Sequence, residues 1–178
     1  LLNLKGAADQ VERQPEGVEY GFEDRWILSR LTETIERITR LLEEFTFNEI
    51  TTTLYAFVWN EFCDWYLEMI KPRLRPEADA DVRLFAQRCL AFTLDQILRL
   101  LHPIIPFVTE ELWQHLNNVL PARGMPGAKQ ETASASIMIA PWPEANADLR
   151  DQDAEIEMER FQNIVRGVRI IRKKLKLP

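Results

Sequence analysis

A run of aromatic and charged residues at positions 59–68 is the part of this sequence best suited to binding chemistry. It reads Trp-Asn-Glu-Phe-Cys-Asp-Trp-Tyr-Leu-Glu and is followed by Lys71 and Arg73. Aromatic rings beside basic groups can stack unpaired bases and hold phosphates. The same rings also suit the core of a helix bundle. The run alone therefore predicts a helical bundle and leaves its role open.

A polar face on the same segment gives a more specific hypothesis. Asn60, Asp64, Leu67 and Lys71 follow one another at helical spacing and should share one face. Leu67 could pack on a base while Asn60 or Asp64 reads the base edge and Lys71 binds a phosphate. The alternative is an ordinary exposed leucine, which is common on protein surfaces.

The C-terminal end is basic, although the net charge of the chain is −6. All seven charged residues after Glu159 are Lys or Arg. Four of them recur at spacings of three and four and should form one helical stripe: Arg169, Arg172, Lys173 and Lys176. The tail from Arg166 to Lys176, which contains this stripe, is predicted to contact RNA backbone or a neighbouring domain and not bases. The alternative is a solubilising face.

No catalytic residues are predicted. The sequence lacks phosphate-binding glycine loops and Gly-x-Ser-x-Gly, and adjacent carboxylates such as Glu43 and Glu44 are typical of a solvated helix. No metal site is expected, because His102 and His115 are far apart and no Cys-x-x-Cys occurs. Cys63 and Cys89 read as reduced thiols. No membrane span or signal peptide is visible, so we expect a cytoplasmic protein.

Hydrophobic periodicity and helix-breaking residues predict an all-α, up-and-down helix bundle. A Pro- and Gly-rich flexible loop is expected at 120–136, with a short strand-like piece at Ile137–Ile139. The predicted helices span 24–44, 46–71, 81–101, 106–118 and 151–175. The expected organisation is the end of a preceding helix and a loop (1–23), the bundle core (24–119), an irregular loop with a short extended segment (120–150) and a final basic helix (151–178).

Local signals suggest where the first two helices begin and end. Asp24 is a plausible N-cap, and Thr46 with Glu49 reads as a capping box, beside a possible Phe45–Ile50 staple. Pro72 should stop the second helix at Lys71. The core stripe of that helix is predicted to contain Leu54, Val58, Phe62, Trp65 and Met69, with a neighbouring stripe of Tyr55, Trp59, Tyr66 and Ile70.

Several motifs resemble the anticodon-binding domain of valyl-tRNA synthetases. The run from Trp59 to Pro72 resembles the central helix of that domain, and Leu-His-Pro-x-x-Pro-Phe-x-Thr-Glu-Glu-Leu-Trp at 101–113 resembles the segment that follows. Asp-Arg-Trp-Ile-Leu-Ser-Arg-Leu at 24–31 and Ala-Pro-Trp-Pro at 140–143 agree in order and spacing. The likeness is strong over 24–113, weaker over 137–178 and poor in 114–136.

The resemblance implies a fold of the class I synthetase anticodon-binding type and a share in ATP- and Mg²⁺-dependent charging of valine tRNA. The implied partners are the anticodon loop of tRNA(Val) and a catalytic domain of the same chain, with no membrane and no DNA. The catalytic signatures His-Ile-Gly-His and Lys-Met-Ser-Lys-Ser are absent, so no cofactor is expected here. The implied tRNA-binding positions are Asn60, Cys63, Asp64, Leu67, Lys71, Arg73, Arg169, Arg172, Lys173 and Lys176.

Two alternatives remain. The Glu-Phe-Cys-Asp-Trp-Tyr run and Lys-Pro favour valine, but the equivalent domain of an isoleucyl-tRNA synthetase shares much of the 101–113 pattern. A helical protein–protein docking module would also account for an acidic body with surface aromatics.

Overall fold

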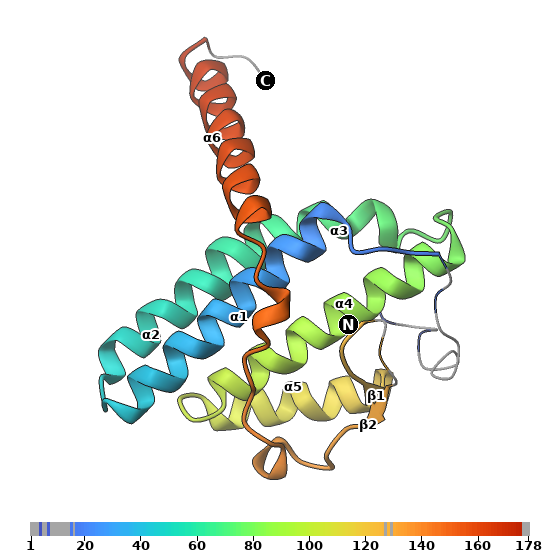
Figure 1. Cartoon of the computed structure of the whole chain (residues 1–178), viewed down its shortest axis with the longest axis vertical. Coiled ribbons are helices and arrows are strands. Elements are labelled where there is room, and N and C mark those ends of the chain that lie inside the picture. Colours follow the sequence, from blue (N-terminus) through green and yellow to red (C-terminus); the bar gives the residue numbers. More distant parts are fainter. Residues whose placement is uncertain are drawn as a thin grey trace.

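The chain forms a helix bundle from which one long helix projects (Figure 1). A computed structural model describes residues 4, 7, 15, 17–126, 128 and 130–175. The all-α bundle predicted from the sequence is confirmed. Its elements are α1 (Phe22–Glu43), α2 (Phe47–Tyr55), the π-helix η3 (Ala56–Tyr66), α3 (Leu67–Leu74), α4 (Ala80–Leu101), α5 (Pro106–Val119), β1 (Ala122–Arg123), β2 (Glu131–Thr132), the 3₁₀ turns η4 (Ile137–Ile139) and η5 (Ala147–Leu149), and α6 (Gln152–Lys174).

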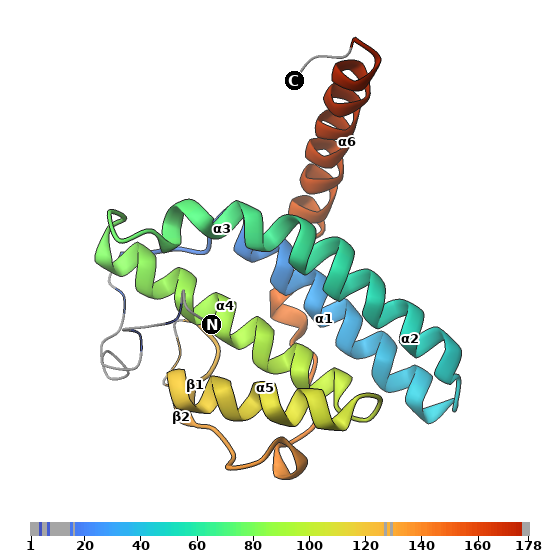
Figure 2. The same ribbon diagram turned by 180° about the vertical axis from the view of Figure 1, so that it is seen from behind.

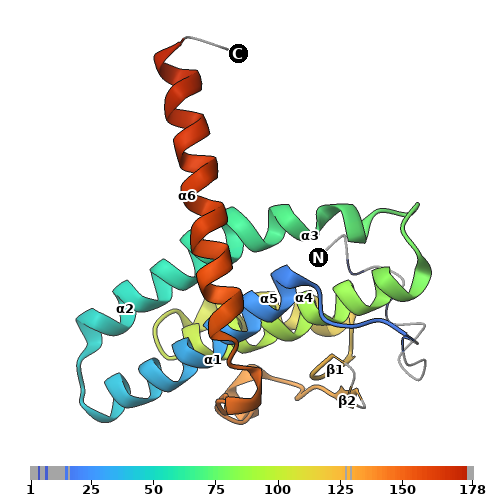
Figure 3. The ribbon, with the colours of Figure 1, turned by 45° about the horizontal axis from the view of Figure 1, so that its top comes forward.

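The bundle is built from successive antiparallel helices. The continuous helix α2–η3–α3 runs back along α1, α4 lies against both, and α5 packs on α4 (Figure 2). Large apolar side chains from every one of these helices are buried between them, including Trp26, Leu54, Phe57, Leu84 and Trp113. Helix α6 crosses α1 only with its first turns and then leaves the bundle (Figure 3).

The middle of the second helix is wider than an α-helix, which changes the face that it buries. Phe57, Phe62, Tyr66 and Ile70 are buried at spacings of five, four and four residues. In a π-helix each N–H bonds to the carbonyl five residues earlier, so successive core positions lie further apart than 3.6 residues. The predicted core stripe is therefore wrong in part: Leu54 and Phe62 are buried, but Val58, Trp65 and Met69 are only half-buried.

Three predicted local signals at helix starts are also wrong: the Asp24 cap, the Thr46 capping box and the Phe45–Ile50 staple. Helix α1 begins at Phe22, and Asp24 stands in its first turn, where its carboxylate accepts a hydrogen bond from the Gly21 N–H at 3.0 Å. Thr46 is the N-cap residue of α2, so the predicted start of this helix is confirmed, but its side chain does not cap the helix, since its hydroxyl donates to the Glu44 carbonyl at 3.4 Å. The staple fails because the side chain of Phe45 is exposed.

Pro72 does not end the second helix, which continues to Leu74. A proline inside a helix removes one backbone hydrogen bond. Tertiary contacts around it compensate: Ile70 is fully buried, and Arg73 forms ion pairs with Glu23 and Asp24 on α1.

The segment between α5 and α6 is irregular, with two short strands that the sequence did not predict. Strands β1 and β2 pair antiparallel, with Ala122 opposite Thr132. The strand expected at 137–139 is wrong, because these residues form the 3₁₀ turn η4. Glu110 accepts hydrogen bonds from the Ser136 hydroxyl and the Ile137 N–H, and Ser136 accepts one from Met138 N–H. These side-chain bonds close the turn and remove the backbone donors that a strand would use.

Candidate nucleic-acid interface

The base of α6 is fixed to α1 by a polar network. The Asp151 carboxylate caps α6 by accepting from the Ala154 N–H at 2.9 Å, and it pairs with Arg25 at 3.0 Å. The Asp151 N–H donates to the hydroxyl of Ser29 at 2.9 Å, and this hydroxyl donates in turn to Glu155. Ser29 is fully buried. The direction in which α6 leaves the bundle is therefore set by α1.

Arg30 joins three helices at this point. Its guanidinium forms a bidentate ion pair with Glu61 of η3, with Nε–Oε2 and Nη2–Oε1 distances of 2.7 and 3.0 Å. A longer contact of 3.5 Å reaches Glu155 of α6. Burial acts to lower the pKa of Arg30, but the neighbouring carboxylates, Glu61 first, raise it above its ordinary value. Arg30 therefore stays charged and holds α1, η3 and α6 together.

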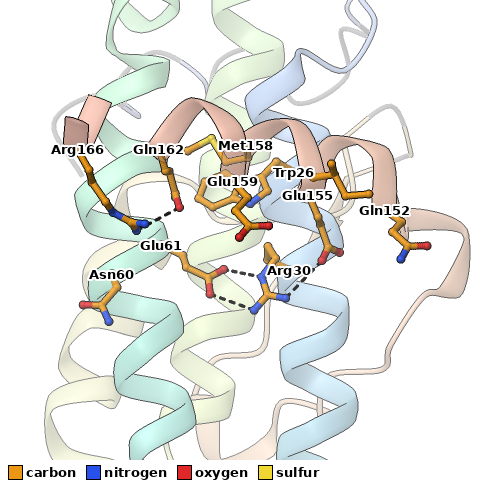
Figure 4. A pocket seen from close by; sticks show the side chains of 11 residues that line it. Trp26, Arg30, Asn60, Glu61, Gln152, Glu155, Met158, Glu159, Gln162 and Arg166 are labelled. Atoms are coloured by element: carbon orange, nitrogen blue, oxygen red, sulfur yellow. Dashed lines mark hydrogen bonds and ion pairs between the residues drawn. The ribbon is translucent and has the colours of Figure 1, made fainter. Parts of the chain in front are cut away.

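A cleft of about 410 Å³ opens between α6 and η3 above this ion pair (Figure 4). Its floor carries the Arg30–Glu61 pair, and its walls carry the amide side chains of Asn60 and Gln162. The complete lining is Trp26, Arg30, Asn60, Glu61, Gln152, Glu155, Ile156, Met158, Glu159, Gln162 and Arg166. The cleft thus combines hydrogen-bonding groups with a lining that carries more acidic residues (Glu61, Glu155 and Glu159) than basic ones (Arg30 and Arg166).

The free part of α6 extends beyond this cleft and carries basic residues on the side that faces η3. Arg169 comes about three turns after the buried Met158, on the same side of the helix. Its guanidinium lies over the ring of Trp65 in η3, 5.7 Å from the centroid. Phe161 meets the same ring edge-on, with centroids 6.0 Å apart. Arg172 follows one turn later, with Lys173 beside it, so both extend this side of α6 away from the bundle.

The residues predicted on η3 and α3 separate into three environments. Asn60 lines the cleft, and Asp64 is exposed one π-turn further along η3. Cys63 is half-buried, and its burial, followed by the nearby Asp64 charge, raises the pKa of its thiol. Leu67 is half-buried and packs against the core, so it is not the fully exposed side chain that one polar face would give.

The two predicted basic residues on α3 have carboxylate partners. The Lys71 ammonium is exposed and donates to Glu68 at 2.5 Å. Arg73 is mostly buried and is held by Glu23 and Asp24. Lys176, the last position of the predicted basic stripe, lies outside the described residues. The structure therefore brings Asn60 close to α6 and places Lys71 and Arg73 further along the helix, beyond the cleft.

Sequence reasoning missed the α6 and α1 residues that complete the cleft. Gln162 was not singled out, and Arg166 was named only as the start of the basic tail, although both follow Met158 at four-residue spacing on the bundle-facing side of α6. Their amphipathic position was a usable signal. The Arg30–Glu61 pair gave no such signal, because its two residues are 31 positions apart and meet only through the packing of α1 on η3.

The arrangement is suited to holding a nucleobase and its phosphates at separate places. Amides such as Asn60 and Gln162 offer both donors and acceptors, as base edges do, while the acidic excess of the cleft lining disfavours phosphate. Phosphates are better held by the guanidinium and ammonium groups on α6. Among the described residues, no group of three or more His, Cys, Asp or Glu side chains could hold a metal ion. In that same part of the chain, no helix could cross a membrane.

Comparison with known proteins agrees with this geometry. The family described as the anticodon-binding domain of tRNA ligase matches residues 24–178. A valine–tRNA ligase of Thermotoga maritima is 46% identical over 155 residues, which cover 87% of this chain and 16% of that protein. A valine–tRNA ligase of Latilactobacillus sakei is 43% identical over all 178 residues, or 18% of its length.

The chain thus spans less than a fifth of the length of these curated relatives. The match nevertheless covers most of the chain, including α1, the π-helix and the projecting helix that together form the cleft. The chain therefore belongs to the family of anticodon-binding domains of tRNA ligases.

Proposed function

We propose that this chain is the part of a valine–tRNA ligase that binds the anticodon loop of tRNA(Val). The observation that carries the proposal is the cleft between α6 and η3, where Asn60 and Gln162 stand beside a basic helix side. The two relatives described above, valine–tRNA ligases that are 46% and 43% identical to this chain, support a valine tRNA as the partner over an isoleucine tRNA.

In this proposal an anticodon base occupies the cleft and hydrogen-bonds to the amides of Asn60 and Gln162. The ribose–phosphate backbone then follows α6, where Arg169, Arg172 and Lys173 neutralise phosphates. Base edges give the sequence preference, and phosphate contacts give affinity without preference. Asp64 and Lys71 continue the exposed side of η3 and α3 beyond Asn60 and remain candidates for contacts to the neighbouring nucleotides.

The parent enzyme would join valine to its tRNA with ATP and Mg²⁺. The residues of this chain do not fit those groups: the sequence has no phosphate-binding glycine loop, and the described residues contain no three-ligand cluster. We therefore assign both to a catalytic domain of the same polypeptide. The share of this domain is to hold the anticodon end, which orients the distant acceptor end of the tRNA at that catalytic domain.

The proposal is tested by the binding of two anticodon stem-loop RNAs to the 178-residue chain. One carries the valine anticodon, and the other differs only in having its anticodon bases replaced. We expect tighter binding of the valine stem-loop and a loss of affinity for both RNAs as salt rises, since phosphate contacts release counterions. Equal affinity for both RNAs would contradict anticodon recognition, and salt-independent binding would contradict the phosphate contacts on α6.

A further inference from the structure

Glu159 differs from the other two carboxylates that line the cleft between α6 and η3. Within the described part of the chain, no hydrogen bond or ion pair engages its side chain, although it lines the cleft. Glu61 holds Arg30 in a bidentate ion pair, and Glu155 accepts from the hydroxyl of Ser29. The oxygens of Glu159 are therefore available to a ligand in the cleft.

The packing of α6 on the bundle holds Glu159 beside the cleft. Met158, the residue before it, is completely buried, and Glu155, one turn earlier, meets a buried serine of α1. Figure 4 shows the side chain of Glu159 extending from α6 toward the Arg30–Glu61 pair. The guanidinium of Arg30 is already held by Glu61 at 2.7 and 3.0 Å. The carboxylate of Glu159 thus faces the space that a base would occupy.

Gln162 places a hydrogen-bond donor next to this acceptor. It follows Glu159 by three residues on α6, a spacing at which the Cβ atoms lie about 5–6 Å apart. The Gln162 side-chain oxygen accepts from Arg166 at 3.4 Å, which leaves the NH₂ group of the amide to donate to a ligand. Glu159 and Gln162 therefore form an acceptor and a donor side by side along one wall of the cleft.

Such a pair is complementary to the edge of a base that carries an amino group. A carboxylate accepts hydrogen bonds and donates none, so its partner must supply the hydrogen. Cytosine and adenine each present an exocyclic amino group next to a ring nitrogen that accepts. Uracil has a carbonyl oxygen where cytosine has the amino group, and a carboxylate repels that oxygen. It repels the oxygens of a phosphate for the same reason.

We propose that Glu159 determines specificity by accepting a hydrogen bond from the exocyclic amino group of a cytosine or adenine in the anticodon. Gln162 donates to the neighbouring ring nitrogen of the same base. The inference rests on the proposed function and adds to it the chemical kind of base that the cleft selects. It also explains why a cleft that binds RNA contains a carboxylate with no cationic partner among the described residues.

A double-mutant cycle between protein and RNA tests this contact. The RNA is the valine anticodon stem-loop, in which each anticodon adenine is replaced in turn by purine ribonucleoside and each cytosine by pyrimidin-2-one ribonucleoside. Each replacement removes only the amino group. Calorimetric titration of the 178-residue chain should show, at one anticodon position, a loss of affinity of at least about tenfold, roughly 1.4 kcal/mol. In Glu159→Ala the same replacement should change the affinity by no more than about twofold.

Glu157→Ala is the matched control. Glu157 is exposed on the same helix, two residues before Glu159, and does not line the cleft. Its substitution removes the same charge and so reproduces any general gain in RNA affinity, but the amino group should keep its tenfold effect. Circular dichroism should show the wild-type helix content in both variants, because both side chains are exposed.

Two outcomes would overturn the inference and leave the proposed function intact. One is an equal loss of affinity on removal of the amino group in the wild type and in Glu159→Ala. The other is a wild-type chain that prefers the valine stem-loop but tolerates every amino-group removal. A chain that binds the valine stem-loop and the loop with replaced anticodon bases equally well would instead overturn the proposed function, and this inference with it.

Discussion

The guanidinium of Arg73 lies 2.6 Å from the carboxylate of Asp24, a residue 49 positions earlier that is completely buried. The same carboxylate accepts from the phenol of Tyr66 at 3.2 Å, and Glu23 adds a second ion pair to Arg73 at 2.8 Å. This cluster fixes the far end of α3 against the first turn of α1. It therefore holds in place the helix that contains η3.

Replacing Arg73 by Met should strongly destabilise the fold, because it leaves the buried Asp24 carboxylate without its cationic partner. Breaking a buried ion pair in this way typically costs about 3–5 kcal/mol. Lys71→Met is the matched control, since the Lys71–Glu68 pair is exposed and should be worth about 0–1 kcal/mol. Chemical denaturation of both variants measures the difference, and equal stabilities would contradict the structural role. That Arg73 contacts RNA stays a prediction. A loss of RNA binding in Arg73→Met would support it only if the variant is still folded.

Arg30→Met should loosen the base of α6. It removes the cationic partner of Glu61 and one of the partners of Glu155, both partly buried, so we expect a loss of about 1–3 kcal/mol. Arg25→Met removes only the more exposed pair with Asp151 and should cost less than about 1 kcal/mol. Amide hydrogen exchange should show faster exchange in the first turns of α6 in Arg30→Met. Exchange no faster than in Arg25→Met would show that Arg30 does not anchor α6.

Stability should fall at alkaline pH, in part because of Tyr20. Its phenol donates to the Pro126 carbonyl at 2.8 Å, and burial, followed by the Cys89 and Asp24 charges, raises its pKa to about 12. A raised pKa means that folding favours the protonated phenol, so this contribution is present below pH 10 and is lost between about 10 and 12. Unfolding free energies of Tyr20→Phe should therefore depend less on pH in this window than those of the wild type. Tyr55→Phe, which removes an exposed hydroxyl, is the control and should leave the pH dependence of the unfolding free energy as in the wild type. If Tyr20→Phe also leaves it unchanged, Tyr20 is not the source of the alkaline loss of stability.

Leu67→Asp should lower the melting temperature. A wholly exposed Leu67 would tolerate the change, but the side chain packs against the core, so a charge there should cost about 1–3 kcal/mol. Asp64→Asn, at an exposed position on the same helix, should change stability by no more than about 0.5 kcal/mol. Thermal unfolding measures both. An unchanged melting temperature for Leu67→Asp would contradict this packing and place Leu67 on the surface. The same variant could then test whether Leu67 contacts a base, without a loss of stability.

The sequence predicted the helices better than it predicted their faces. Apolar residues at helical spacing and breakers such as Pro103 and Pro106 located each long helix. The face of the second helix was wrong because the 3.6-residue period does not hold in η3, and local sequence gives little sign of a π-helix. Asp24 was read as a local cap, whereas its partner Arg73 is distant in sequence.

The candidate site was predicted only in part, because it depends on contacts between residues that are distant in sequence. Asn60 and Arg169 could be singled out because each belongs to a local pattern of polar or basic residues. Their proximity depends on the direction of α6, which is set by Ser29 and Arg30 on α1. Such long-range packing has no periodic signature, so the meeting of Gln162 and Arg166 with Asn60 across the cleft was found only in the folded structure.

The central claim is that anticodon bases are read in the cleft between α6 and η3. Its most direct test is the ratio of affinities of the chain for the valine stem-loop and for the loop with replaced anticodon bases. Asn60→Ala with Gln162→Ala should reduce this ratio by about tenfold, since a lost base contact costs about 1–3 kcal/mol. Arg169→Gln with Lys173→Gln should weaken both RNAs alike, lowering the salt dependence while keeping the ratio. A ratio that survives the loss of Asn60 and Gln162 in a folded protein would contradict the account.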